Sequence, residues 1–410
     1  MNITGEAQKF DIEALAKDLA QALATHGIDV PVRLPLKYGI NPHQAAVAWV
    51  EKDVKVLNGK FNPHKNAIDV GAINVYDALF SGYPLAAELK EATGLPAAAT
   101  IKHTSPSGAA IAKPLDEQLH EAYSCQDKEL SPLATAFVRA FETDPKSAYG
   151  CIAALSDVVD VPTALRLKHR VIDGIIAPGY EPEAFNILKG KRDGNQLIME
   201  VSPSYSPPPV TVVFDNGALV VQERNNVRVT EEIFSPVVSE RTEIPSEKKL
   251  DGIVAAVAAK YTQSNTAVFA YDGQTTGVGA GQQSRVDVVR LAGQKTLVWA
   301  MRQYPLIMSM QFPKKTSYLS KLHAKVQGIG QIHPDSQYAF LQRKFADRFV
   351  VVSDSFFPFE DNVEEAAKHG AGYIVQPGRG ERFEKVVEDV NRNNMWMSSP
   401  PLSKYRLFRH

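Results

Sequence analysis

The chain has 410 residues, with 45 Lys and Arg against 46 Asp and Glu and a formal net charge of −1. A charge so close to zero disfavours a protein that binds nucleic acid through bulk positive charge, and it equally disfavours a self-repelling disordered chain. Hydrophobic residues make up 44% of the sequence, which is enough for sizeable cores. Because a domain usually has about 100–200 residues, we expect two or three structural units.

Nothing in the sequence is typical of a membrane or secreted protein. The longest apolar runs, such as residues 253–259, are too short to cross a bilayer. The first residues lack the basic and then apolar segments of a signal peptide. The two cysteines, Cys125 and Cys151, belong to no CxxC pair, so we expect neither a disulfide framework nor a structural zinc site. These features predict a soluble, cytoplasmic protein of several domains.

The first predicted element is a helix over residues 12–23. Apolar residues recur there at helical spacing, Asp11 is suited to cap the helix and Gly27 to end it. From about residue 90 onward, short apolar runs alternate with helical stretches, which indicates an α/β architecture. A proline-rich stretch over residues 202–210 interrupts this pattern and predicts a surface turn or an extended crossing.

The sequence repeats itself weakly. Residues 153–162 resemble residues 351–359, because each contains an apolar strand that runs into Ser-Asp and is followed about twenty residues later by a strand ending in Pro-Gly. Residues 97–113 resemble residues 266–285, and each is predicted as a strand, a polar glycine-containing loop and a helical stretch. Two pairs of similar segments in the same order favour two related α/β subdomains. We predict an N-terminal helical segment (1–33), a first subdomain (34–240) and a second subdomain (241–410).

The first candidate site is the pair Lys102-His103, where an apolar strand ends and a Pro/Gly loop begins. Functional groups of α/β proteins often lie at such strand ends. Histidine suits general-base catalysis near neutral pH, and an adjacent ammonium can stabilise an oxyanion on an attacked carbonyl. A solvated lysine beside a histidine bonded to a loop carbonyl would give the same pattern, so the spacing leaves both interpretations open.

Two further segments have the composition of ligand-binding loops. Residues 37–44, KYGINPHQ, could hold a phosphate and stack a heterocycle, although an ordinary Asn-Pro turn fits equally well. Residues 260–265, KYTQSN, precede a glycine-rich stretch over residues 277–285 whose backbone could approach a ligand closely. The alternative for that stretch is a glycine-rich hairpin leading into a helix.

Two C-terminal segments complete the candidates. The three phenylalanines of residues 353–362, SDSFFPFEDN, could form a slot for a flat ring or simply pack in a core. Asn362 and Glu365 predict a capping box for a short helix that ends near Gly370. Residues 404–410 alternate cationic with apolar residues, as a strand with one buried face does, and an ordered cationic tail would suit a phosphate site.

Several common motifs are missing from the sequence. We find no GxGxxG dinucleotide fingerprint, no phosphate loop, no HExxH and no GxSxG. The HxE and PCxxC motifs of the zinc deaminases are also missing in the required arrangement. We therefore expect no catalytic metal.

Eight stretches taken together resemble a known family. LKYGINPHQ, IKHTSPSGAA, SAYGCIAALSD, DGIIAPGYEPEA, KYTQSN, GVGAGQQSR, SDSFFPFEDN and LFRH are similar, in this order, to the signature stretches of the aminoimidazole carboxamide ribonucleotide (AICAR) formyltransferases. That activity is one part of a bifunctional purine-biosynthesis protein that also carries inosine monophosphate (IMP) cyclohydrolase. The resemblance implies formyl transfer from 10-formyltetrahydrofolate to the 5-amino group of AICAR. It also implies two cytidine-deaminase-like subdomains, each a three-layer α/β/α unit without the deaminase zinc, in a homodimer with sites at its interface.

The resemblance also assigns residues to roles. His103 would accept a proton from the attacking amine, and Lys102 would stabilise charge on the formyl oxygen. The nucleotide-contacting positions of the family fall on Lys37, Tyr38, Gly150, Asp173, Asn265, Arg285, Phe356 and Arg406. The folate-contacting positions fall on Val286, Asp361 and the loop Gly378, Arg379 and Gly380.

This sequence departs from the family pattern in four places, one of which is a stretch between about residues 310 and 349 that is shorter than in the animal enzymes of the family. Lys37 stands where the family commonly has Arg, so the bidentate fork for phosphate is lost. Arg379 adds a cation near the expected folate site. About 33 residues precede the first motif, too few for a cyclohydrolase domain, so we expect no cyclohydrolase activity and a separate cyclohydrolase as a possible partner. We expect no nucleic-acid or membrane partner.

Two other functions remain open at this level. A catalytically silent homologue that binds purine ribonucleotides would keep the binding motifs. A formyltransferase that uses formate and ATP would also fit, because ATP-binding folds without a phosphate loop exist.

Overall fold

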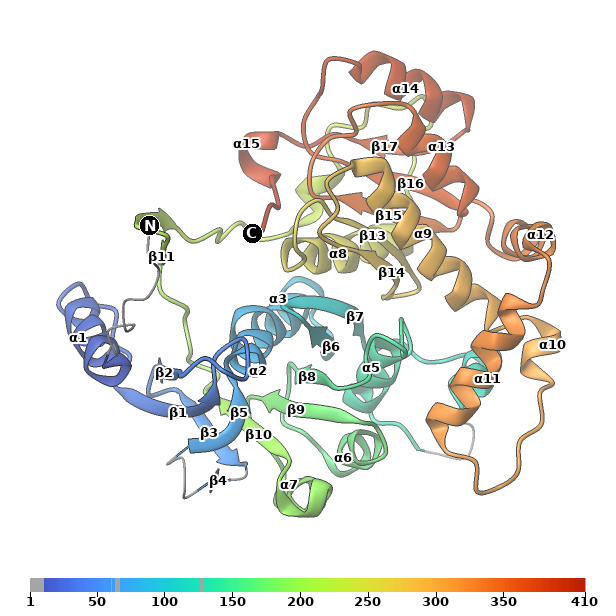
Figure 1. Ribbon diagram of the computed structural model, residues 1–410. Helices are drawn as coiled ribbons and strands as arrows, with labels where there is room; N and C mark the ends of the chain where they lie inside the picture. Colours follow the sequence, from blue (N-terminus) through green and yellow to red (C-terminus); the bar gives the residue numbers. More distant parts are fainter. Residues whose placement is uncertain (1–10, 60, 63–66, 126–128, 410) are drawn as a thin grey trace, which may run out of the picture.

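An eleven-stranded mixed sheet runs through the whole molecule (Figure 1). The computed structural model describes residues 11–409 apart from residues 60, 63–66 and 126–128. The strand order along the sheet is β17-β16-β15-β13-β14-β7-β6-β8-β9-β10-β3. The structure confirms the α/β class that the alternating sequence pattern predicts.

The first half of the sheet contains the strands from β7 to β3. The β6–β7 and β6–β8 pairs are antiparallel, β8, β9 and β10 are parallel, and β3 adds to β10 in antiparallel fashion. The strands are β3 (Val54–Asn58), β6 (Ala97–Lys102), β7 (Ser105–Ile111), β8 (Cys151–Leu155), β9 (Ile172–Ala177) and β10 (Leu197–Val201).

The second half repeats this arrangement. The β13–β14 and β13–β15 pairs are antiparallel, and β15, β16 and β17 are parallel. The strands are β13 (Ala267–Tyr271), β14 (Gln274–Gly279), β15 (Phe349–Ser353), β16 (Ala371–Val375) and β17 (Trp396–Ser398). Both halves therefore place their second hairpin strand at the centre of the sheet, where β7 and β14 meet in an antiparallel pair.

Corresponding helices connect the strands of the two halves. In the first half they are α3 (Tyr83–Thr93), α5 (Pro132–Phe141), α6 (Val161–Lys168) and α7 (Pro182–Lys189). In the second half they are α8 (Ser246–Lys260), α9 (Arg285–Met301), α13 (Asp361–Lys368) and α14 (Phe383–Arg392). The subdomain boundaries at residues 33 and 240 remain predictions.

The sheet lies between two layers of helices. Alternate residues of β6 face opposite sides: Ala97 and Ile101 pack in the core shared with α3 and α8, whereas Ala98 packs in the core beside α5. The α9, α13 and α14 helices form a further core on the α5 side of the second half. Because both faces are covered, the central strands are buried on both sides and appear in the sequence as continuous apolar runs.

The prediction of a helical stretch after Lys102 is wrong. Residues Ser105–Ile111 form β7, which pairs with β6 along its length, and the next long helix begins only at Pro132. Gly108 lies against the backbone of α5, where a Cβ would overlap the carbonyl oxygen of Ala140. Small residues suit this position because the backbones of the strand and the helix approach closely there. The helical propensity of these small residues does not decide the structure.

A buried arginine links the two halves at the centre of the sheet. Arg139 of α5 is fully buried and donates hydrogen bonds to the backbone carbonyls of Lys113, Pro114 and Asp272. It also donates to the side chains of Asp272 and Gln274, at 2.8 and 3.0 Å. The planar guanidinium, with its five donors, can satisfy all these acceptors at once.

The N-terminal region forms a smaller layer beside the first half (Figure 1). It contains α1 (Ile12–Ala24) and a four-stranded sheet in the order β2-β1-β5-β4. The Asp11 side chain accepts a hydrogen bond from the Ala14 amide and caps α1, and Gly27 has a φ of +77°, as the sequence predicts. The strands and the following helices are β1 (Val32–Tyr38), β2 (Val47–Val50), β4 (Phe61–Asn62), β5 (Ala67–Gly71), α2 (Ala72–Val75) and the π-helix η1 (Tyr76–Gly82).

The remaining elements connect or cover these layers. Residues 202–209 form no helix or strand, which confirms the predicted break, and they lead into a two-stranded hairpin. Cys125 and Cys151 are both buried and form no disulfide with each other. Within the described part of the chain, none of the helices has the length and apolar character needed to cross a membrane. The further elements are α4 (Glu117–Ala122), η2 (Lys191–Gly194), β11 (Val210–Asp215), β12 (Ala218–Glu223), η3 (Glu231–Phe234), α10 (Pro305–Met308), α11 (Tyr318–Gly330), α12 (Pro334–Phe345) and α15 (Leu402–Tyr405).

The close contact of β14 with α9 predicts that Gly277 tolerates no side chain. A methyl group there would overlap the Ala292 carbonyl oxygen and lie 2.6 Å from Thr296 Oγ1. We expect Gly277→Ala to lower the free energy of unfolding by about 3 kcal/mol, because the strand and helix must separate. Urea denaturation measures the change. Gly330→Ala is the control, since a Cβ at Gly330 meets nothing within 4 Å, and equal stability of the two variants would contradict the close packing.

Candidate functional site

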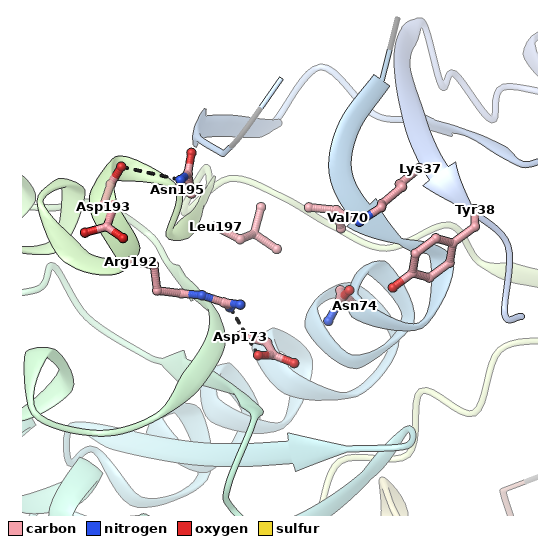
Figure 2. Close-up of a pocket in the computed structure, with 9 residues that line it drawn as sticks. All are labelled: Lys37, Tyr38, Val70, Asn74, Asp173, Arg192, Asp193, Asn195 and Leu197. Atoms are coloured by element: carbon pink, nitrogen blue, oxygen red, sulfur yellow. Dashed lines mark hydrogen bonds and ion pairs between the residues drawn. The ribbon is translucent and has the colours of Figure 1, made fainter. Parts of the chain in front are cut away.

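A polar cavity of about 450 Å³ opens beside the edge of the first half of the sheet (Figure 2). On one side Figure 2 shows Lys37 and Tyr38, from the end of β1, and Asn74 of α2. On the other side it shows Asp173, near the start of β9, and the η2 turn. The lining residues are Lys37, Tyr38, Val70, Asn74, Asp173, Arg192, Asp193, Asn195 and Leu197.

The cavity brings together three residues predicted to bind the nucleotide, Lys37, Tyr38 and Asp173. The Lys37 ammonium lies 5.7 Å from the centre of the Tyr38 ring. Gly71 of β5 makes room for that ring, since a Cβ there would overlap it. The position of Tyr38 therefore depends on a glycine that is 33 residues away in the sequence.

The η2 turn supplies cations that the sequence analysis missed. Arg192 Nη1 lies 3.1 Å from Asp173 Oδ1, and both side chains are about half exposed. The pKa of Lys191 is lowered to about 8, mainly by burial and also by neighbouring Arg192, while Asp173 opposes the shift. The adjacent Lys191-Arg192 pair followed by Gly194 was the available sequence signal. Cations at such a turn can bind an anion that enters the cavity.

Lys102 and Gly150 lie next to this cavity. Lys102 Nζ donates a 2.7 Å hydrogen bond to the carbonyl oxygen of Tyr149, the residue before Gly150. Gly150 has a φ of +72°, and a Cβ there would lie 3.6 Å from the Asp173 carboxylate. The ends of β6, β8 and β9 thus gather Lys102, Gly150 and Asp173 at one edge of the sheet.

His103 lies in the two-residue turn between β6 and β7. His103 and Thr104 have φ values of +53° and +63°, and His103 is exposed. Arg409 of the C-terminal tail donates a 3.2 Å hydrogen bond to the Thr104 carbonyl, and the Gln263 amide donates to Ser105 Oγ at 3.2 Å. The turn is therefore in contact with segments of the second half.

The second group of predicted residues is centred on Arg285, the first residue of α9. Its guanidinium donates to Asn265 Oδ1 and to Ser353 Oγ, both at 2.7 Å, and forms an ion pair with Asp354. Arg285 and Asp354 are both buried. The Asn265 amide in turn donates to the carbonyl oxygen of Gln282 at 2.9 Å. Val286 follows on α9 and is half-buried.

The predicted folate loop packs against one phenylalanine. A Cβ at Gly380 would lie 2.9 Å from the Phe356 ring, and Gly378 has a φ of +85°. The exposed Arg379 extends over the Phe383 ring, 4.6 Å from its centre. Asp361 is exposed at the start of α13.

The structure corrects two expectations for residues 353–362. Phe357 is buried in the core, Phe359 is half exposed beside Arg382, and Phe356 is half-buried at Gly380, so the three rings do not form one slot. The capping box is also wrong, because α13 begins at Asp361 and the Asn362 amide donates to the Phe359 carbonyl. An acidic residue already begins this helix, so Asn362 lies within its first turn. The helix does end beside Gly370, where φ is +81°.

The C-terminal tail is ordered but forms no strand. Residues 402–405 form α15, after which the Leu407 amide donates to the Asp354 carbonyl and the Ser264 amide donates to the Arg409 carbonyl. Leu407 is buried whereas Arg406 is exposed, as the alternating pattern predicts, and the Arg406 guanidinium lies 4.1 Å from the centre of the Phe408 ring. His410 lies outside the described residues.

Residues 37–44 contain both a part of the cavity wall and a turn, the two alternatives that the sequence leaves open. Lys37 and Tyr38 face the cavity, while the following residues form a turn in which Gln44 Oε1 accepts the Asn41 amide at 2.8 Å. The glycine-rich stretch forms β14 and leads into α9, as the hairpin alternative predicts. Among the described residues, no group of three or more His, Cys, Asp and Glu side chains could hold a metal ion.

The fold and the site define a mixed α/β protein with a polar cavity at strand ends, lined by the cations Lys37 and Arg192 and the carboxylates Asp173 and Asp193, which suits a polar small molecule. The model of the AICARFT/IMPCHase bienzyme family matches residues 11–295. The bifunctional purine biosynthesis protein PurH of Cereibacter sphaeroides is 31% identical over 378 residues, which cover 92% of this chain and 59% of that protein. The protein of the same name from Dinoroseobacter shibae is 30% identical over 377 residues, with the same coverage.

The chain therefore belongs to the AICARFT/IMPCHase bienzyme family. It spans 59% of the length of the curated relatives that it matches.

The ion pair at the start of α9 predicts a large stability effect. Asp354→Ala would leave Arg285 buried beside Ser353 and Asn265 without its counter-charge, so we expect the free energy of unfolding to fall by about 3–5 kcal/mol. Asp287→Ala breaks an exposed pair with Arg290 on the same helix and should cost less than about 1 kcal/mol. Urea denaturation compares the two variants, and similar losses would contradict the role given to the buried pair.

Proposed function

We propose that this protein transfers the formyl group of 10-formyltetrahydrofolate to the 5-amino group of AICAR in purine biosynthesis. The observation that carries the proposal is that Lys102, the neighbour of His103, bonds to the carbonyl before Gly150, which lies close to Asp173 at a cavity also lined by Lys37 and Tyr38. The family resemblance had assigned these six residues, from separate motifs, to a single reaction. Family membership and the purine biosynthesis relatives support the same conclusion.

In the proposed reaction the 5-amino nitrogen attacks the formyl carbon, and a new C–N bond forms. His103 accepts a proton from the amine, and Lys102 stabilises the oxyanion that develops on the formyl oxygen. The bond from the formyl carbon to N10 of the folate then breaks, and N10 takes up a proton. The products are formyl-AICAR and tetrahydrofolate. Because the amine is conjugated with the imidazole and weakly nucleophilic, positioning must supply much of the rate.

The cavity suits the ribonucleotide. Lys37 and Arg192 provide positive charge for a phosphate from opposite sides, and Asp173 provides an acceptor for hydroxyl groups. The half-buried Lys37 acts as a point charge, whereas Arg192 can form two parallel hydrogen bonds to phosphate oxygens. Gly150, Asn265, Arg285, Phe356 and Arg406 are the further nucleotide contacts that the resemblance implies.

The folate is proposed to bind along Val286, Asp361 and residues 378–380. The loop passes Phe356 closely at Gly380, and the exposed Arg379 could pair with a carboxylate of the folate glutamate. No catalytic metal takes part in this proposal.

The finer structural assignments belong to the same proposal. The shared strand order of the two halves supports two cytidine-deaminase-like subdomains without the deaminase zinc. Predicted nucleotide contacts lie in two groups, one at the cavity and one around Arg285, which supports a homodimer in which one site uses residues of both copies. The cytoplasm is the compartment in which we expect the protein to act.

The proposed base predicts that His103→Ala abolishes most of the turnover. We expect kcat for formyl transfer to fall by about 10²–10⁴-fold, since a positioned general base contributes that much. The measurement is formation of tetrahydrofolate with AICAR and 10-formyltetrahydrofolate. His26→Ala, at an exposed position after α1, is the control and should keep wild-type activity.

Equal rates for wild type and His103→Ala would reject the assigned base. A wild-type protein that binds AICAR but forms no product would support the silent ribonucleotide-binding homologue. Turnover that requires formate and ATP, and not 10-formyltetrahydrofolate, would support the second alternative.

The shared-site proposal predicts complementation between two inactive variants. Lys102→Ala removes the proposed oxyanion-stabilising ammonium of the first half. Arg406→Ala removes the exposed guanidinium of a proposed nucleotide contact in the second half. If one copy supplies each residue, a mixed dimer contains one intact site, so an equal mixture should regain about a quarter of wild-type activity. Activity of the mixture after subunit exchange measures this.

Mixing Lys102→Ala with His103→Ala is the matched control, since both changes lie on the same turn and leave no intact site. No recovery in the first mixture, despite demonstrated exchange, would contradict a site shared between copies.

A further inference from the structure

The turn that carries His103 has an unfavourable backbone conformation. His103 and Thr104 both have positive φ, as the central residues of a two-residue β-hairpin turn require. Asn-Gly and Asp-Gly are the usual residues there, whereas a β-branched residue such as Thr is an outlier at positive φ. A non-glycine residue in this region costs about 1–3 kcal/mol, so surrounding groups must hold the turn in place.

A buried carboxylate holds it. Asp77, in the π-helix η1, is 4% exposed, and its Oδ1 accepts a 2.6 Å hydrogen bond from the Thr104 amide. Burial raises the pKa of the Asp77 carboxyl, and backbone hydrogen bonds from Thr104 and His103 and the nearby charges of His103 and Arg409 oppose that rise. The carboxylate therefore faces the backbone of the turn at Thr104.

The carbonyl of Thr104 is fixed from the same side. Ser81, one helical turn after Asp77 on η1, donates a 2.7 Å hydrogen bond to it. Arg409 donates to the same carbonyl at 3.2 Å and to Ser81 Oγ at 2.7 Å. A π-helix is rare and often occurs at functional sites, and here its wider turn carries both residues that bind Thr104.

The second half of the protein contains the same contact without the strain. Its β13–β14 turn consists of Asp272 and Gly273, with φ values of +52° and +75°, and the Gly273 amide donates a 2.7 Å hydrogen bond to Asp251 Oδ1. Asp251 is a buried residue of α8, the helix that precedes this hairpin. The repeat thus keeps an aspartate under each turn, but only one turn uses the favoured Asp-Gly pair.

We propose that Asp77 is a positioning residue for His103: its carboxylate holds the His103-Thr104 turn at positive φ, so that the imidazole is presented beside Lys102 and the cavity. This inference rests on the proposed function for its catalytic consequence. Asp77 touches no substrate in this role and acts only through the backbone of the turn. Replacing the turn by Asp-Gly, as in the second half, would make the carboxylate unnecessary for the conformation and would remove His103.

Asp77→Ala tests the proposal. We expect kcat to fall by about 10²-fold with little change in the KM for AICAR, because a displacement of about 1 Å at a catalytic group costs that much. Adding Thr104→Gly should recover at least about tenfold in kcat, since glycine adopts positive φ without strain. Rates are expressed per folded molecule, with the folded fraction taken from circular dichroism.

Asp251→Ala is the matched control. It removes the same kind of hydrogen bond from the turn of the second half, where Gly273 already accepts the conformation. We expect it to lower the melting temperature while kcat stays within about twofold of wild type. If Asp77→Ala does not fold, Asp77→Asn replaces it, with an expected loss in kcat of about tenfold because a neutral acceptor bonds more weakly.

Hydrogen–deuterium exchange of residues 101–108 tests, without any substrate, whether the Asp77 carboxylate stabilises the turn. We expect faster exchange at residue 104 in Asp77→Ala, and this result is independent of whether the wild type transfers formyl groups. An inactive wild type would overturn the proposed function alone. Unchanged exchange, an unchanged kcat, or a double variant no faster than Asp77→Ala would each overturn the positioning role of Asp77.

Discussion

The continuity of the sheet across its centre is the constraint on which the rest of the structure depends. The two halves meet where β7 lies beside β14, and Arg139 binds backbone carbonyls from both halves at that point. Because the guanidinium is fully buried, it requires acceptors on every side. The β6–β7 and β13–β14 hairpins therefore lie next to each other at the centre of one sheet, joined by the β7–β14 pair and by Arg139.

The two halves share one kind of hairpin turn but differ in the residues that form it. Each half has a two-residue turn at positive φ above a buried aspartate, Asp77 in the first and Asp251 in the second. The second half has the turn residues that the conformation favours. The first half has His103 and Thr104, which the conformation disfavours. Local strain that the fold retains at one of two equivalent positions points to function at that position.

Much of the fold and part of the site could be predicted from the sequence. Asp11 and Gly27 bound the first helix, and the paired Ser-Asp and Pro-Gly endings locate corresponding strands. The prediction of a helical stretch after Lys102 is wrong because the small residues of the 105–111 strand serve close strand–helix packing, which propensity does not reveal. The capping role predicted for Asn362 is wrong because the N-cap of that helix is Glu360, two residues earlier. Arg192 and Asp77 were missed because their partners, Asp173 and Thr104, are distant in sequence.

The sequence by itself determined the α/β class, the family and the residues that carry chemical groups, since these depend on residue type, periodicity and ordered motifs. Only the tertiary structure decided which of those groups meet. Lys37, Tyr38 and Asp173 share a cavity because β1 ends where β9 begins, and Asp77 lies under the turn of His103 because a π-helix packs against β6. Contacts between residues so far apart in the sequence depend on long-range packing and backbone geometry, which no local pattern along the chain contains.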